Sequence, residues 1–174
     1  MLIFIIGYMG SGKTVLGRKL AGMLKYRFLD MDEMIEVSSG YSIVHYFEKF
    51  GETSFRLIER ELLMNHLAET DCVIATGGGT PCYEDNMALM NSHGITVFID
   101  TGSDTILERL SGKIQQRPLL KQIPKEKLPE FIREHMNSRR VFYDQAKFRI
   151  SGKEPDMEEL VKDLLKIEGL NSSF

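Results

Sequence analysis

A glycine-rich segment near the N-terminus has the residue types and spacing of a phosphate-binding loop. Gly7-Tyr-Met-Gly-Ser-Gly-Lys-Thr14 matches the pattern G-x-x-x-x-G-K-[ST] between an apolar run and a helical pattern. Glycines let backbone N–H groups surround a phosphate, and the helix N-terminus adds partial positive charge. Lys13 would neutralise the outer phosphates, and Thr14 would offer a hydroxyl to Mg²⁺. We therefore expect a nucleoside triphosphate site, rather than a glycine-rich turn without a ligand.

Two aspartates are the nearest acidic candidates for the same site. The sequence has no Asn-Lys-x-Asp motif of the kind that reads the base in a GTPase, and the third apolar run leads to Thr76 without an aspartate for Mg²⁺. Asp30 and Asp32 follow the second apolar run, where residues of a parallel sheet face the ligand crevice. One carboxylate can then lie near the metal and the other near a substrate hydroxyl. The alternative is a solvated acidic helix start.

A glycine triplet and three arginines are further candidates. Gly77-Gly-Gly79 follows the third run at the same predicted sheet edge, and glycines permit close approach of the backbone to a ligand. Arg56, with Glu59 three residues later, is either a carboxylate clamp or an ordinary surface ion pair. Arg117 lies in a loop and Arg139 in a late helix, and the position of either residue alone does not indicate a function.

The other side chains of chemical interest are interpreted as structural. Phe47 and Phe50 are expected in the core. Cys72 and Cys82 lack the spacing of a metal-ligand pair and do not form a disulfide framework, so we expect reduced thiols. Four histidines show no metal-ligand pattern and are interpreted as surface or structural residues: His45, His66, His93 and His135.

Short apolar runs that alternate with helical patterns must position these residues. Glycine flanks and β-branched residues indicate that the runs are strands, at residues 2–6, 28–29, 72–75, 96–99 and 148–150. Strand–helix alternation with continuously apolar strands is typical of a parallel sheet that is covered on both faces. We predict a three-layer α/β fold of about five strands.

Two segments depart from this alternation. Residues 33–62 are expected to hold two or three short helices, which exceeds a minimal crossover and indicates an inserted substrate-side element. Residues 111–125 are polar and basic and contain Gly112, Pro118 and Pro124, which predicts a mobile loop between helices. A loop of this length in a compact domain is usually functional or disordered.

Composition fits one soluble domain and excludes several classes of function. The 174 residues are 43% hydrophobic and 27% charged, with a net charge of −3. These values exclude global disorder and a basic nucleic-acid footprint. No apolar stretch approaches the roughly 18 residues that span a bilayer, and the apolar N-terminus lacks a basic leader. We expect a cytoplasmic monomer, with neither nucleic acid nor membrane as a partner.

Five motifs together resemble the shikimate kinase family, in order and spacing over nearly the whole chain. They are Gly7-Tyr-Met-Gly-Ser-Gly-Lys-Thr14, Phe28-Leu-Asp-Met-Asp32, Gly51-Glu-Thr-Ser-Phe-Arg-Leu-Ile-Glu59, Ala75-Thr-Gly-Gly-Gly79 and Arg117-Pro-Leu-Leu120. The resemblance implies a P-loop kinase fold in a single domain, residues 1–174. It implies Mg²⁺-dependent phosphorylation of the shikimate 3-hydroxyl by ATP, in chorismate and aromatic amino-acid biosynthesis.

The resemblance also implies roles for individual residues. The substrate-binding segment would span residues 31–62 and the lid residues 111–125. Catalysis would depend on Lys13, Asp32 and Arg117. Shikimate would contact Asp32, Arg56, Gly78, Gly79 and Arg139. ATP would contact Gly10, Ser11, Gly12, Lys13, Thr14, Arg109, Arg117, Lys153 and Pro155. Mg²⁺ would be held by Thr14 and by Asp30, directly or through water.

The chain departs from the family pattern at two places, and two other functions stay open. The family often reads Arg-x-Pro-Leu-Tyr in the late helix, where this chain has Arg139-Arg-Val-Phe-Tyr143. The tyrosine selects Arg139, but without the proline Arg140 is an alternative. The adenine-side loop, residues 151–155, matches only loosely. The alternative functions are another small-molecule or nucleoside monophosphate kinase, and a nucleotide-binding regulatory module without transferase activity.

Overall fold

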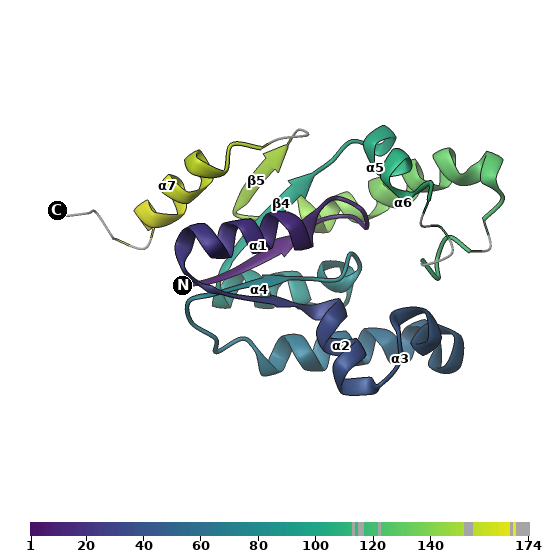
Figure 1. Ribbon diagram of the computed structural model, residues 1–174, viewed down its shortest axis with the longest axis horizontal. Helices are drawn as coiled ribbons and strands as arrows, with labels where there is room; N and C mark the ends of the chain where they lie inside the picture. Colours follow the sequence, from purple (N-terminus) through teal and green to yellow (C-terminus); the bar gives the residue numbers. More distant parts are fainter. Residues whose placement is uncertain (113, 115–116, 122, 152–154, 168, 170–174) are drawn as a thin grey trace.

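A five-stranded parallel sheet forms the centre of the molecule, in the order β2-β3-β1-β4-β5 (Figure 1). The computed structural model describes all residues except 113, 115–116, 122, 152–154, 168 and 170–174. The strands are β1 (Leu2–Ile6), β2 (Arg27–Asp30), β3 (Cys72–Ala75), β4 (Ile95–Asp100) and β5 (Phe148–Ser151). All five predicted strands are confirmed, with ends within one residue of the expected positions.

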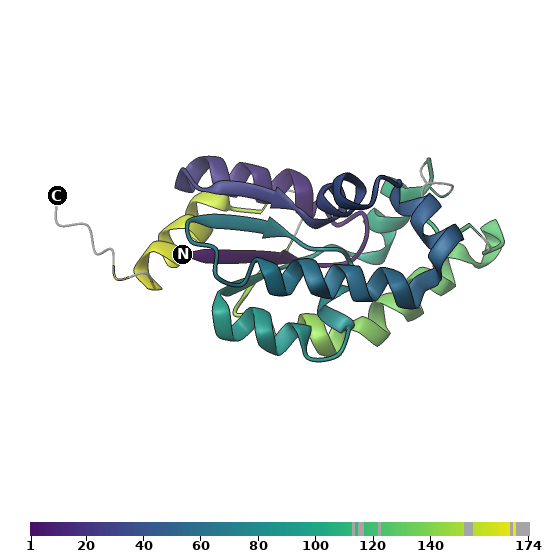
Figure 2. The same ribbon diagram turned by 90° about the horizontal axis from the view of Figure 1, so that it is seen from below.

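Helices cover both faces of the sheet, which confirms the three-layer prediction (Figure 2). One face is covered by α1 (Lys13–Leu24) and α7 (Met157–Ile167). The other face is covered by α3 (Ile43–Asn65), α4 (Asn86–His93), α5 (Ser103–Leu110) and α6 (Leu128–Tyr143). Two short 3₁₀ helices, Thr80–Cys82 and Lys125–Lys127, complete the described elements. Within the described residues, no helix has the length and apolar character needed to cross a bilayer.

The position of β1 at the centre of the sheet explains why its residues are all apolar, without the alternation of a half-buried strand. Ile3 and Ile5 belong to the core beneath α1 and α7. Phe4 and Ile6 belong to the core on the opposite face. All five residues of β1 are buried, as expected for a strand of a parallel sheet between two helical layers. The buried strand fixes the place where the glycine-rich loop leaves the sheet.

The segment between β2 and β3 consists of helices, as predicted. It contains α2 (Met31–Ser39) followed by α3, which is interrupted at Gly51. The backbone of Gly51 has φ 78° and ψ 173°, a conformation that is essentially restricted to glycine. This kink divides α3 into two helical pieces, so the segment projects beyond the carboxyl edge of the sheet (Figure 1).

The described part of the predicted loop between α5 and α6 packs onto the body of the protein. Leu120 is fully buried within the core. Lys121 forms an ion pair with Glu48 of α3, with 2.6 Å between Nζ and Oε1. These contacts place residues 117–121 over the carboxyl edge of the sheet, in a closed arrangement. The mobility of this segment stays a prediction.

Candidate active site

The glycine-rich loop connects β1 to α1 and bends sharply. Gly7, Gly10 and Gly12 have φ values of 148°, 78° and 102°, which side-chain-bearing residues rarely adopt. The Nζ of Lys13 returns to this loop and donates to the carbonyl oxygens of Gly7 at 2.9 Å and Tyr8 at 3.0 Å. Burial lowers the pKa of Lys13 to about 8, although the charge of Asp32 opposes this shift. The lysine is therefore held beside the loop, in a desolvated position.

A cavity lies over this loop and has the chemistry of an anion site. The predicted phosphate-binding residues that line it are Gly10, Ser11, Gly12, Lys13, Thr14, Arg109 and Arg117. Arg109 donates from α5 to the carbonyl oxygens of Gly10 at 3.2 Å and Ser11 at 3.0 Å. Ser11 Oγ and Arg117 Nε are buried atoms for which the described part of the chain provides no hydrogen-bond partner. An oxyanion in this cavity would give both groups a partner.

Two of the predicted adenine-side residues do not contribute to this picture. Lys153 lies outside the described residues. Pro155 precedes α7 and is not among the residues that line the cavity. The adenine-side role of both residues stays a prediction.

Asp30 combines the two roles that the sequence left open. Its Oδ1 accepts a hydrogen bond from the backbone N–H of Asp32 at 3.0 Å and so caps α2. Its Oδ2 accepts the hydroxyl hydrogen of Thr14 at 2.7 Å. A hydroxyl and a carboxylate at the cavity wall are oxygen donors of the kind that Mg²⁺ prefers. Within the described residues, no cluster of three or more His, Cys, Asp or Glu forms a metal cage.

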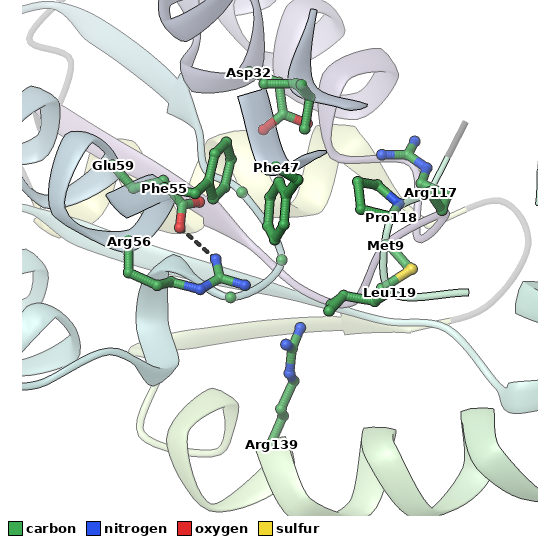
Figure 3. A pocket seen from close by; sticks show the side chains of 14 residues that line it. Met9, Asp32, Phe47, Phe55, Arg56, Glu59, Arg117, Pro118, Leu119 and Arg139 are labelled. Atoms are coloured by element: carbon green, nitrogen blue, oxygen red, sulfur yellow. Dashed lines mark hydrogen bonds and ion pairs between the residues drawn. The ribbon is translucent and has the colours of Figure 1, made fainter. Parts of the chain in front are cut away.

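A second, smaller cavity adjoins the first and is lined by arginine, acidic and apolar side chains (Figure 3). Arg56 of α3 and Arg139 of α6 point into it, and each is only 9% exposed. Asp32 lies at the opposite end in Figure 3. Apolar side chains form much of the wall between them, namely Met9, Ile43, Phe47, Phe55, Pro118 and Leu119. The cavity thus presents Arg56 and Arg139 at one end, and at the other Asp32 with the charge of Arg117 nearby.

Arg56 is held by a buried ion pair, so the surface interpretation of this residue is wrong. Its guanidinium donates to Glu59, which is 1% exposed, and also pairs with Glu52 at 3.0 Å. Glu59 accepts a further hydrogen bond from the hydroxyl of Thr80 at 2.6 Å. Burial raises the pKa of Glu59, while Arg56 opposes the shift. The buried Glu59 and the half-exposed Glu52 therefore orient the guanidinium, which lines the cavity.

The glycine triplet accommodates these side chains. A Cβ at Gly77 would collide with the carboxylate of Glu59, and a Cβ at Gly79 would collide with the guanidinium of Arg56. Gly78 lines both cavities, and a Cβ there would lie 3.1 Å from the backbone nitrogen of Met9. The sequence analysis expected these glycines to let a ligand approach the backbone. In the structure, they also make room for the side chains of Arg56 and Glu59.

The structure selects Arg139 over Arg140 for the cavity. Arg140 points away from it and pairs with Asp100 at 3.1 Å and Asp144 at 3.4 Å. Arg139 lines the cavity, with its guanidinium carbon 5.8 Å from the centroid of the Tyr8 ring. The Tyr143 hydroxyl, one helical turn further along α6, donates to the carbonyl oxygen of Gly78 at 2.6 Å.

Four residues line both cavities and mark where they meet: Met9, Asp32, Gly78 and Arg117. Burial raises the pKa of Asp32, and the charge of Lys13 opposes this shift. Asp32 is thus a more basic carboxylate than usual, placed between a phosphate loop and an arginine pair. This geometry can align a hydroxyl with a terminal phosphate and accept its proton.

The expectation that Phe47 and Phe50 are ordinary core residues is wrong. Phe47 is only half-buried and lines the smaller cavity, and its ring is tilted by 39° against that of Phe55 with 4.4 Å between centroids. Phe50 is 44% exposed. The glycine that separates Phe47 from Phe55 is the one signal that could have placed them, because the kink at Gly51 turns the first helical piece over the cavity.

Comparison with known proteins gives a consistent result. The shikimate kinase family model matches residues 9–168. A shikimate kinase from Phocaeicola vulgatus is 43% identical over 145 residues, which are 83% of either chain. The solved shikimate kinase from Bacteroides thetaiotaomicron superposes with a TM-score of 0.85 at 37% identity and covers 98% of this chain and 99% of its own. A shikimate kinase from Acinetobacter baumannii, solved in complex with shikimate, gives a TM-score of 0.85 at 32% identity, over 99% of this chain and 95% of its own. The chain belongs to the shikimate kinase family.

Proposed function

We propose that the two cavities are the ATP and shikimate sites of one active centre, in which the 3-hydroxyl of shikimate is phosphorylated. A member of the shikimate kinase family is an ATP-dependent phosphotransferase of aromatic amino-acid biosynthesis. The observation that carries the finer assignment is the smaller cavity, with Arg56 and Arg139 at one end and Asp32 where it meets the phosphate loop.

The arginine pair orients the substrate. Arg56 and Arg139 present planar guanidinium groups that can grip a carboxylate in a bidentate manner. The ring of the substrate then lies against Phe47 and Phe55, which exclude water. This orientation directs a ring hydroxyl towards Asp32, whose raised pKa suits a group that must accept a proton near neutral pH.

Positive charge at the phosphate end lowers the barrier for transfer. Phosphoryl transfer depends on positioning and on neutralising the charge that spreads over the migrating group. Lys13 and Arg117, which both line the larger cavity, supply that charge, and the N–H groups of the glycine-rich loop add to it. Thr14 and Asp30 would hold Mg²⁺, which supplies further positive charge to the phosphates when bound.

The surrounding elements complete the proposal. Residues 1–174 act as one domain and a monomer in the cytoplasm, with residues 31–62 as the shikimate segment and residues 111–125 as the lid. Leu120 anchors the lid in the core, while Arg117, Pro118 and Leu119 face the cavities. Such a cover excludes water, so that ATP is not lost to hydrolysis.

One assay tests the function against its alternatives. ATP consumption is measured with Mg²⁺ alone, with shikimate, with shikimate methyl ester and with nucleoside monophosphates. We expect consumption with shikimate only, because buried arginines without a carboxylate partner penalise the ester strongly. Comparable kcat/KM values for shikimate and its ester would contradict the proposal that Arg56 and Arg139 bind the substrate carboxylate. Turnover of a nucleotide acceptor instead would favour another kinase, and ATP binding without any product would favour a regulatory module.

A further inference from the structure

Tyr8 joins the phosphate loop to the helix that carries Arg139. Its side chain is 2% exposed, and its hydroxyl lies 2.9 Å from Nδ1 of His135 in α6. The two rings meet edge to face, with 5.5 Å between centroids. The backbone carbonyl of the same tyrosine accepts a hydrogen bond from Lys13 Nζ at 3.0 Å. One residue of the loop therefore touches the phosphate lysine through its backbone and α6 through its side chain.

His135, Arg139 and Tyr143 follow one another at intervals of four residues and so share one face of α6. The first is bonded to Tyr8, and the last is bonded to Gly78. Arg139, between them, lies over the face of the Tyr8 ring. The substrate arginine thus lies between two anchors, one turn before it on the Tyr8 side chain and one turn after it on the backbone carbonyl of Gly78.

The protonation states give the hydrogen bond its direction. Burial raises the pKa of Tyr8 to about 12, with Arg139 opposing the shift, so the phenol keeps its proton. Burial lowers the pKa of His135 to about 4, and the charges of Arg139 and Arg56 act in the same sense, whereas Glu52 opposes them. Both groups are therefore neutral, and in the tautomer that carries its hydrogen on Nε2 the imidazole accepts at Nδ1 from the Tyr8 hydroxyl. A third positive charge beside the arginine pair is thereby avoided.

We propose that Tyr8 and His135 are positioning residues for shikimate, whose hydrogen bond sets the distance between Arg139 and the phosphate loop. The inference rests on the proposed function, because it takes Arg139 as a ligand of the substrate carboxylate. Transfer requires the acceptor hydroxyl and the phosphate to be close and aligned, and small displacements are costly. A hydrogen bond that connects the helix of Arg139 to the loop beside Lys13 keeps the bound substrate aligned with the phosphate.

The test compares Tyr8→Phe, His135→Phe and the double variant, each with shikimate and ATP varied separately. Loss of one hydrogen bond is expected to raise KM for shikimate by roughly three- to tenfold, and to leave KM for ATP unchanged. The double variant should be no worse than either single one, because the two groups act as one unit. His135→Gln keeps an acceptor for the phenol and should retain most of the affinity for shikimate. Tyr83→Phe, at a half-buried tyrosine outside the shikimate segment and both cavities, is the control and should change neither constant.

Three results would overturn the inference: an unchanged KM for shikimate in Tyr8→Phe, additive effects in the double variant, or equal losses for both substrates. Thermal unfolding of each variant shows whether an equal loss comes from a damaged fold. Arg139→Ala in the same series separates this inference from the proposed function. If Arg139→Ala raises KM for shikimate and Tyr8→Phe does not, only the positioning role fails. If Arg139→Ala does not change KM for shikimate, Arg139 is not a ligand of the substrate carboxylate, and the positioning role of Tyr8 and His135 fails as well.

Discussion

Asp32 is the residue on which the chemical step is expected to depend. Asp32→Asn keeps the shape of the side chain but cannot accept the hydroxyl proton. General-base assistance is worth about 10²–10⁴-fold, so kcat should fall within that range while KM for ATP changes little. Steady-state kinetics with each substrate varied would check this. Loss of ATP binding instead would assign Asp32 to the metal side and exchange its role with that of Asp30.

The pH profile offers a second test at the same residue. A base must be deprotonated, so activity is present above the pKa of Asp32 and is lost as the pH falls through it. Because burial raises this pKa, the acidic limb of kcat/KM for shikimate should lie above the ordinary value of 3.8. An acidic limb at or below that value would mean that burial does not tune this carboxylate.

Lys13 should produce the alkaline limb. With a pKa of about 8 in the free protein, the ammonium is charged below that pH and loses its charge above it. Bound phosphates favour the charged form, so kcat should persist to higher pH than kcat/KM for ATP. Calorimetric ATP affinity between pH 7 and 10 would measure the effect. Constant affinity across this range would contradict a desolvated phosphate-binding lysine.

The sequence predicted the location of the polar site residues better than that of the apolar ones. The P-loop pattern and the pair Asp30 and Asp32 gave their locations directly, because residues after parallel strands share one sheet edge. Arg56 stayed ambiguous, since the burial of Glu59 depends on elements far apart in the sequence. Phe47 was misplaced because an apolar side chain in a helix has the same pattern whether it faces the core or a ligand.

Among the elements, α3 depends most on a single glycine. Gly51→Ala places a side chain at φ 78° and ψ 173°, where no steric neighbour lies within 4 Å but the backbone conformation itself is unfavourable. Strain of this kind costs about 1–3 kcal/mol. We expect a lower denaturation midpoint and a higher KM for shikimate, because Phe47 and Phe55 lie on either side of the kink. Gly169→Ala, at a positive-φ glycine outside the shikimate segment, is the control for strain and should not change KM.

The lid should act through Arg117. Arginines that stabilise a phosphoryl-transfer transition state are worth about 10³–10⁵ in rate, and the lower end is expected because Lys13 already neutralises part of the charge. Arg117→Ala should therefore lower kcat about 10³-fold and weaken the binding of shikimate alone much less. Hydrogen exchange over residues 111–125 should slow when both ligands are added to the wild type. Exchange that is already slow without ligands would show a fixed cover rather than a lid.

The strands were predictable from the sequence because runs such as residues 2–6 and 72–75 are apolar, short and bounded by glycines. The closed packing of the loop was not, because polar, proline-containing segments predict mobility from composition alone. Leu120 is buried in the core cluster that also contains Leu110 of α5 and Leu128 of α6, and the Lys121–Glu48 pair joins residues 73 positions apart.

For the molecule as a whole, His135 should contribute to acid sensitivity. Its pKa is lowered from 6.5 to about 4 on folding, so the unfolded chain binds more protons between these values. The contribution to stability is fully present above pH 6.5 and is lost as the pH falls towards 4. His135→Gln should therefore show a flatter dependence of unfolding free energy on pH across this window than the wild type. Denaturant titrations at several pH values would compare the slopes, and parallel curves would mean that His135 is not buried in a neutral state.

The wall that the two cavities share has a consequence for inhibition. A compound that spans both cavities would rest against Asp32 and Arg117, which the proposed reaction uses, and against Gly78, where a Cβ would lie only 3.1 Å from the backbone nitrogen of Met9. Substitutions there that weaken the compound should also weaken turnover. For a compound confined to the apolar wall around Ile43 and Leu119, substitutions that weaken its binding need not weaken turnover. Selection for drug resistance should consequently yield escape variants readily against the second kind of compound and rarely against the first.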